Sequence, residues 1–246
     1  MENKRFATFA EAVKDIPDGS SIMLGGFGPG TPHNLIKAIY EQGATGLTLI
    51  LNSAGAGRAN AEHVTAATLI ESHRVKKVMA AFTAATHPSQ RSALEDLQAS
   101  GEIEAELMPQ GTLAERIRAA GVGIPAFYTP AAVGTELAEG KEHREFNGRA
   151  YLLAEALYAD YAFVRARRAD EFGNLIYQGT ERNFNPLMAT AARCTIVETE
   201  EVVPTGSLDP NQVHTPGIYV HRLVQIPPDG IFHVQRPRPE PRPPRS

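Results

Sequence analysis

Residues Ser20–Pro32 read Ser-Ser-Ile-Met-Leu-Gly-Gly-Phe-Gly-Pro-Gly-Thr-Pro. The apolar run 22–24 is typical of a buried strand. It is followed by glycines that are too dense for the interior of a strand or a helix: Gly25, Gly26, Gly28 and Gly30. A backbone without Cβ atoms lets a ligand approach its N–H groups closely. The glycines therefore indicate either a tight strand–helix turn or a loop that binds a substrate or cofactor.

A helix is expected directly after this loop. Thr31 or Asn34 can cap it, and the apolar residues of 35–39 then share one face. A second strand, 47–51, also ends in a turn of small residues, Asn52–Gly57. In a parallel α/β sheet such turns meet at the carboxyl ends of the strands, where ligands bind.

The rest of the chain continues to alternate strands and helices. Asn147-Gly148 lies between a polar and an apolar segment and predicts a tight hairpin, whereas Thr112 with Glu115 forms a capping-box pattern. Strands are expected over 75–82, 103–108, 161–164, 175–177, 195–197 and 220–224, and helices over 6–13, 58–71, 89–100, 113–120 and 186–192. Residues 1–226 are expected to form the folded domain, and the proline- and arginine-rich segment 227–246 a disordered tail.

Composition excludes several classes of protein. The formal net charge of −4 gives no indication of a surface for nucleic acid or for an anionic membrane. Cys194 is the only cysteine, so a disulfide framework is excluded, and a reducing, cytoplasmic compartment is expected with Cys194 as a buried structural thiol. No segment is long and apolar enough to span a bilayer. The eight histidines show no metal-type spacing, so no metal is expected.

The glycine spacing excludes one phosphate-binding motif and gives only weak support to another. The loop lacks Gly-Lys-Ser/Thr, so it is not a P-loop. Gly26, Gly28 and Gly30 are spaced Gly-x-Gly-x-Gly rather than Gly-x-Gly-x-x-Gly, which gives only weak support to a dinucleotide site.

Several longer sequence motifs occur in a specific order along residues 4–226. They are Asp18-Gly19, Gly25-Gly26-Phe27, Gly30-Thr31-Pro32, 109–118, 125–130, 145–148, Ala169-Asp170, Gly173-Asn174, 182–185 and 214–220. With these motifs the chain resembles the A subunits of family I coenzyme A transferases, and within them those that act on 3-oxoacids such as 3-oxoadipate. The resemblance implies an α/β fold with an open, largely parallel sheet flanked by helices and an antiparallel hairpin insertion.

The resemblance also implies an activity and a partner. CoA would move between a dicarboxylic acid such as succinate and a 3-oxoacid, with CoA thioesters as substrates and no permanently bound cofactor. The family's nucleophile is a glutamate near Glu-Asn-Gly, a sequence that this chain lacks. The nucleophile is therefore expected on a partner B subunit, in an A2B2 assembly.

Three groups of residues are candidates for the site by resemblance. Asn52 would stabilise the oxyanion of the attacked thioester; the alternative is an asparagine that caps a strand-end turn. Gln110 would bind the oxoacid, or be a plain turn residue. The glycines Gly25, Gly26, Gly28 and Gly30 would form the pocket wall, with Phe27 packing there. Arg182 and Asn183 could clamp a substrate carboxylate, although a structural role is favoured.

Two departures from the family pattern keep a second hypothesis open. The loop between Phe27 and Gly30 is one residue shorter than usual, and Asn52-Ser53 stands where the family has two asparagines. A non-catalytic module that binds acyl-CoA, as a sensor or regulator, would tolerate both changes. An isomerase on a related fold is a weaker third option, because no convincing general base is present.

Overall fold

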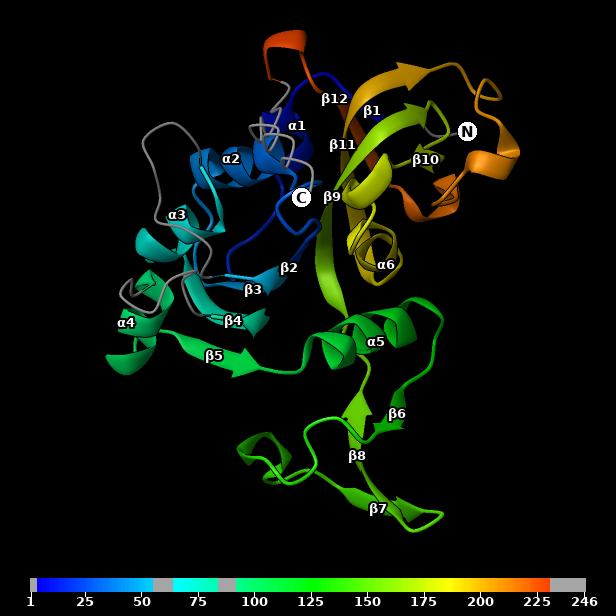
Figure 1. Cartoon of the computed structure of the whole chain (residues 1–246). Coiled ribbons are helices and arrows are strands. Elements are labelled where there is room, and N and C mark those ends of the chain that lie inside the picture. Colours follow the sequence, from blue (N-terminus) through cyan, green and yellow to red (C-terminus); the bar gives the residue numbers. More distant parts are fainter. Residues whose placement is uncertain (1–3, 55–63, 84–91, 231–246) are drawn as a thin grey trace, which may run out of the picture.

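The computed structural model describes residues 4–54, 64–83 and 92–230 and contains two sheets (Figure 1). The large sheet runs in the order β1-β12-β11-β9-β2-β3-β4-β5, with β10 beside β9. Its neighbouring strands are parallel, apart from the antiparallel β9–β10 pair. The strands are β1 (Arg5–Phe6), β2 (Ser21–Leu24), β3 (Leu47–Ser53), β4 (Val75–Phe82), β5 (Glu104–Leu107), β9 (Ala159–Asp170), β10 (Leu175–Ile176), β11 (Ala192–Val203) and β12 (Arg222–Gln225).

Helices cover both faces of this sheet because its central strands are apolar on both sides. On β2, Ile22 and Leu24 face one core and Met23 faces the other. The first core is closed by α1 (Phe9–Val13), α2 (His33–Gln42), α3 (Ala66–Glu71) and α4 (Ala93–Ala99). The second core is closed by α5 (Gln110–Gly121) and α6 (Asn185–Thr190).

A small antiparallel sheet projects beyond α5, in the order β6-β8-β7 (Figure 1). Its strands are β6 (Ala126–Thr129), β7 (His143–Phe146) and β8 (Arg149–Glu155). Asn147 and Gly148 connect β7 to β8 with φ of 51° and 73°. Positive φ at both central residues is the geometry that favours Asn-Gly in a two-residue hairpin. The predicted hairpin and the largely parallel sheet are both confirmed.

The strand order identifies the place along the sheet where a ligand would bind. From β2 the chain adds β3, β4 and β5 on one side, then returns to add β9, β11 and β12 on the other. The order therefore reverses between β2 and β9. Ligands of open α/β sheets bind outside the carboxyl ends of the strands at such a switch point, and here the glycine-rich loop leaves β2 at that place.

Two predicted helix caps are wrong. Helix α2 begins after Pro32, which has no side-chain cap to offer, and Thr31 Oγ1 instead donates to the Gly28 carbonyl (2.9 Å). Helix α5 begins after Pro109, two residues before Thr112, so Thr112 lies within the first turn. Glu115 pairs with Arg118 instead of closing a box.

Some predicted boundaries also shift. Helix α1 begins only at Phe9, because Arg5–Phe6 pairs with β12 as a short strand. Residues 58–63 and 89–91 of two predicted helices lie outside the described residues, as does 231–246 of the predicted tail. In the described part of the chain, no helix is long and apolar enough to cross a membrane. Nor do three potential metal-binding side chains gather anywhere in that part.

Candidate active site

Asn52 lies near the carboxyl end of β3 and is 1% exposed. Its Oδ1 accepts a hydrogen bond from Gln110 Nε2 (2.7 Å). Its Nδ2 is buried and has no hydrogen-bond partner among the described residues. An unpaired buried donor is costly, and in native proteins it calls for a functional or structural explanation.

Gln110 reaches Asn52 from the first residue of α5. Because the Gln110 amide donates to Oδ1, the Asn52 amide is held with its two N–H bonds directed away from Gln110. The Oγ1 of Thr112, in the same first turn of α5, is likewise buried without a partner in the described ranges. The two predicted site residues Asn52 and Gln110 are therefore brought into direct contact.

The glycine-rich loop begins near Asn52, because it leaves β2, the strand that pairs with β3. The paired register of β2 and β3 ends with Met23 beside Ile50, and Gly25 and Asn52 each follow two residues later along the chain. Met23 and Ile50 both face the core under α5 and α6, and residues two positions apart on a strand point to the same face. The loop and the Asn52 amide thus share one side of the switch point.

Tight packing explains three of the loop glycines. A Cβ on Gly25 would lie 2.9 Å from Asn185 Cγ, and one on Gly26 would lie 2.5 Å from the Thr31 nitrogen. A Cβ on Gly30 would clash with the Glu181 carbonyl. Gly28 differs, because a Cβ there would meet nothing within 4 Å among the described residues.

Phe27, expected to pack in the pocket wall, is 51% exposed. It lies between the crowded Gly26 and the open Gly28. The loop therefore presents an aromatic ring and open backbone at its tip, whereas its two ends are packed.

Asn183, in the segment before α6, contacts the glycine-rich loop at Pro29. Its Nδ2 donates to the Pro29 carbonyl (2.9 Å) and to the Thr180 carbonyl (2.8 Å). These contacts support the structural interpretation of Asn183 that the sequence favours.

A buried carboxylate that the sequence does not single out holds the start of α2. Glu198, on β11, is fully buried and accepts a hydrogen bond from the Leu35 N–H (3.0 Å). Asn34 Nδ2 also donates to it (3.4 Å). A carboxylate at a helix N-terminus satisfies free N–H groups and interacts favourably with the helix dipole.

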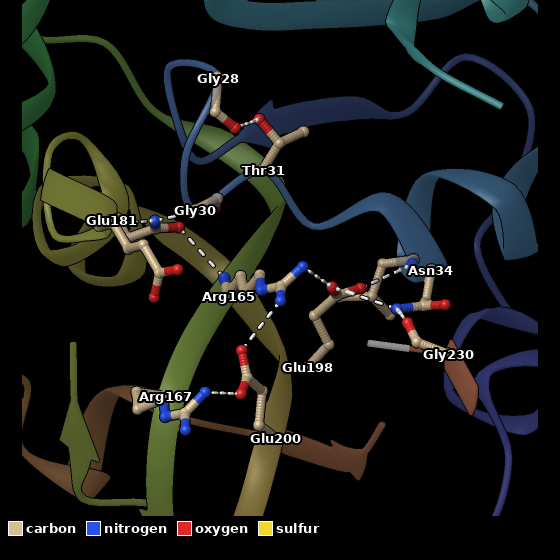
Figure 2. Close-up of polar contacts among 12 residues, drawn as sticks. Gly28, Gly30, Thr31, Asn34, Arg165, Arg167, Glu181, Glu198, Glu200 and Gly230 are labelled. Atoms are coloured by element: carbon tan, nitrogen blue, oxygen red, sulfur yellow. Dashed lines mark hydrogen bonds and ion pairs between the residues drawn. The ribbon is translucent and has the colours of Figure 1, made fainter. Parts of the chain in front are cut away.

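Arg165 lies between Glu198 and Glu200 (Figure 2). Its guanidinium is 3.9 Å from Glu198 and 2.9 Å from Glu200, which also pairs with Arg167. Burial nevertheless raises the pKa of Glu198 to about 7, an effect that the Leu35 N–H and Arg165 only partly offset. Glu198 therefore titrates near neutral pH at the start of α2, the helix that follows the glycine-rich loop.

We expect Glu198→Gln to change how folding stability depends on pH. An ordinary glutamate has a pKa of about 4.3. Between that value and about 7 the folded wild type binds more protons than the unfolded chain, so its stability falls as pH rises through this window. The free energy of unfolding of both proteins is measured in urea from about pH 5 to pH 8. The difference between variant and wild type should shift in favour of the variant as pH rises to neutral, and should then stay constant. A pH-independent difference would contradict the raised pKa.

Comparison with known proteins identifies the family to which this fold and site belong. Residues 6–225 match the coenzyme A transferase family model, so the chain belongs to the coenzyme A transferases. Over 90% of its length it is 46% identical to the A subunit of the probable succinyl-CoA:3-ketoacid coenzyme A transferase of Bacillus subtilis (strain 168), covering 89% of that protein. It is 45% identical to the A subunit of the 3-oxoadipate CoA-transferase of Pseudomonas putida, over 92% of this chain and 95% of that protein. The resemblance to A subunits and the prediction of a transferase enzyme are confirmed.

Solved structures support the same fold. A variant of the decarboxylase AibA/AibB superposes with a TM-score of 0.75 at 27% identity, over 94% of this chain and 86% of that one. Glutaconate coenzyme A-transferase from Acidaminococcus fermentans superposes with a TM-score of 0.76 at 22% identity, over 91% and 76%. At that identity the second likeness shows the fold alone.

Proposed function

We propose that the chain is the A subunit of a transferase that moves CoA from a dicarboxylic acid such as succinate to a 3-oxoacid. The names of the similar A subunits imply a B subunit, and we place the catalytic glutamate on that partner, in an A2B2 assembly. Acyl-CoA thioesters are the substrates, with no permanently bound cofactor. The single cysteine supports a cytoplasmic location.

The proposed reaction proceeds through two acyl transfers. The partner's glutamate attacks the thioester carbonyl, and the tetrahedral oxyanion collapses to a mixed anhydride as the CoA thiolate leaves. The thiolate then attacks the glutamyl carbonyl of the anhydride, which releases the first acid and leaves a glutamyl-CoA thioester. The second acid takes up the CoA when these steps run in reverse.

The observation that carries the proposal is the buried Asn52 Nδ2 without a partner among the described residues. A donor that is already fixed where negative charge develops stabilises the transition state without reorganising. Such a donor typically lowers the activation free energy by about 3 kcal/mol. An asparagine that merely caps the turn would use its oxygen on nearby backbone N–H groups. Here the hydrogen bond to Oδ1 comes from the Gln110 side chain.

The pocket wall is assigned to the loop beside Asn52. Gly28 and Phe27 offer open backbone and an exposed ring, and Gly25, Gly26 and Gly30 fix the backbone on either side of them. The acid to be accepted would lie between this tip and the Asn52 amide.

Co-expression with a cognate B chain that carries Glu-Asn-Gly tests the proposal. The assay uses succinyl-CoA with acetoacetate, with 3-oxoadipate and with a panel of other acids, and each chain alone is the control. Transfer that requires both chains supports the proposal, and the panel identifies the acid. An assembled pair that transfers CoA to no acid but binds acyl-CoA would favour a binding module instead.

Gln110 is expected to act mainly by orienting Asn52. In Gln110→Glu a carboxylate would face Asn52 Oδ1, and the Asn52 amide should turn to donate to it, which removes the oxyanion donor. We expect kcat to fall about tenfold or more below that of Gln110→Ala, which leaves the amide free. Steady-state kinetics of both variants give the answer. If Gln110 bound the acid directly, both variants would instead raise KM for the acid at unchanged kcat.

A further inference from the structure

Asn185 makes three hydrogen bonds to backbone groups of separate segments. It is the first residue of α6, and it is fully buried. Its Nδ2 donates to the Gly30 carbonyl (3.0 Å) and to the Glu181 carbonyl (2.8 Å). Its Oδ1 accepts from the Arg165 N–H on β9 (3.1 Å). The carboxamide therefore joins the glycine-rich loop to the strand on the far side of the switch point.

The Asn185 side chain ends the ladder between β2 and β9. The Gly25 N–H donates to the Phe163 carbonyl (2.9 Å), which is the last bond of the parallel pattern. In a continued ladder the Arg165 N–H would donate to the Gly25 carbonyl. It donates to Asn185 instead, so β2 separates from β9 at Gly25 and the glycine-rich loop begins.

Both ends of the loop contact this one side chain. A Cβ on Gly25 would lie 2.9 Å from Asn185 Cγ, and a Cβ on Gly30 would lie 2.8 Å from Asn185 Nδ2. The span from Gly25 to Gly30 is thus closed around the carboxamide. The position of its tip, Phe27 and Gly28, depends on where Asn185 lies.

We propose that Asn185 is a positioning residue of the transferase site, which sets the distance between the glycine-rich loop and the Asn52 amide. This inference rests on the proposed function. The hydrogen bonds that Asn185 makes within the described residues go to Arg165, Gly30 and Glu181 and not to Asn52, so we infer that it acts on substrates through the loop.

The substitution Asn185→Ala removes all three bonds and tests the role in the assembled two-chain enzyme. We expect KM for the acceptor acid to rise about tenfold, because a displaced wall weakens binding, with a smaller change in kcat. In Asn185→Asp a carboxylate keeps the acceptor for Arg165 but cannot donate to Gly30 until it is protonated. Its KM should therefore recover partly as pH falls.

Thr195→Val is the matched control. Thr195 is fully buried, and its Oγ1 donates to the Ala189 carbonyl near the other end of α6 (2.8 Å). The control loses a buried hydrogen bond of the same helix without touching the loop. It should lower Tm while leaving KM for the acid at the wild-type value.

Amide hydrogen exchange of the isolated chain gives a readout that does not depend on activity. In Asn185→Ala the Gly26, Phe27 and Gly28 amides should exchange faster than in wild type and in Thr195→Val. If the wild-type pair transfers no CoA, the proposed function fails, and exchange still decides whether Asn185 holds the loop. Unchanged loop exchange, or a KM that changes no more than in Thr195→Val, would overturn the inference.

Discussion

Asn52→Ala should lower kcat for CoA transfer by about 10²- to 10³-fold while this chain still assembles with its partner. The reason is that Nδ2 is a buried donor without a partner in the described structure, held in place by Gln110. Loss of one preorganised oxyanion donor typically has an effect of this size. The measurement is steady-state transfer from succinyl-CoA to the best acceptor acid, with size-exclusion chromatography to confirm assembly.

Asn52→Asp distinguishes the oxyanion donor from a turn cap. Aspartate has nearly the same shape and keeps an oxygen that Gln110 can bond, but it has no N–H to give. If Asn52 acts as the donor, Asn52→Asp should be at least as slow as Asn52→Ala, because its negative charge also repels the oxyanion. Near-wild-type turnover in Asn52→Asp would show that the asparagine serves as a cap.

Gly30→Ala, at the packed end of the glycine-rich loop, should destabilise the fold more than the same change at Gly28 in the loop tip. Gly30 has φ of 77°, which strains a residue with a Cβ by about 1–2 kcal/mol. The added methyl would also clash with the Glu181 carbonyl and lie 2.8 Å from Asn185 Nδ2. Overpacking of this kind typically costs a further 1–3 kcal/mol or so. Urea unfolding should therefore show a loss of roughly 3 kcal/mol.

Gly28→Ala is the matched control for this prediction. Its φ of 73° carries the same backbone strain, but its Cβ would meet no described atom within 4 Å. It should lose only the strain of about 1–2 kcal/mol. Equal losses in Gly28→Ala and Gly30→Ala would contradict the role of the contact with Glu181 and Asn185.

Local sequence patterns predict strand β4 and the turn between β7 and β8 well. The β4 boundaries 75–82 are confirmed, and Asn147-Gly148 forms the expected hairpin, because both depend on neighbouring residues alone. The predicted cap of α2 fails for the opposite reason. The group that satisfies the Leu35 N–H is Glu198, which comes from β11 far along the chain. No local pattern identifies such a partner.

Charged residues hide the length of two strands. The sequence predicts strands only over 161–164 and 195–197, whereas β9 and β11 each extend over twelve residues. Their continuations are rich in arginine on β9 and in glutamate on β11. The register places Arg165 beside Glu198 and Arg168 beside Glu201, so the charges pair across the strands. Cross-strand pairs of opposite charge stabilise a sheet, but they become visible only once the register is known.

The candidate site is predictable from the sequence in part. The sequence singles out both Asn52 and Gln110, and the structure adds that they contact each other. Asn185 is close to Asn183 in the sequence, yet nothing there shows that Asn185 rather than Asn183 is fully buried. Its role follows from contacts with Gly30 and Arg165, which lie far from it in the sequence.

The most direct test of this mechanism is to find which chain carries the covalent CoA adduct. The assembled pair is mixed with succinyl-CoA in the absence of an acceptor acid, and both intact chains are measured by mass spectrometry. We predict a CoA thioester adduct on the partner chain alone, formed much more slowly with Asn52→Ala. An adduct on this chain, or one that forms at the same rate without the Asn52 amide, would contradict the mechanism.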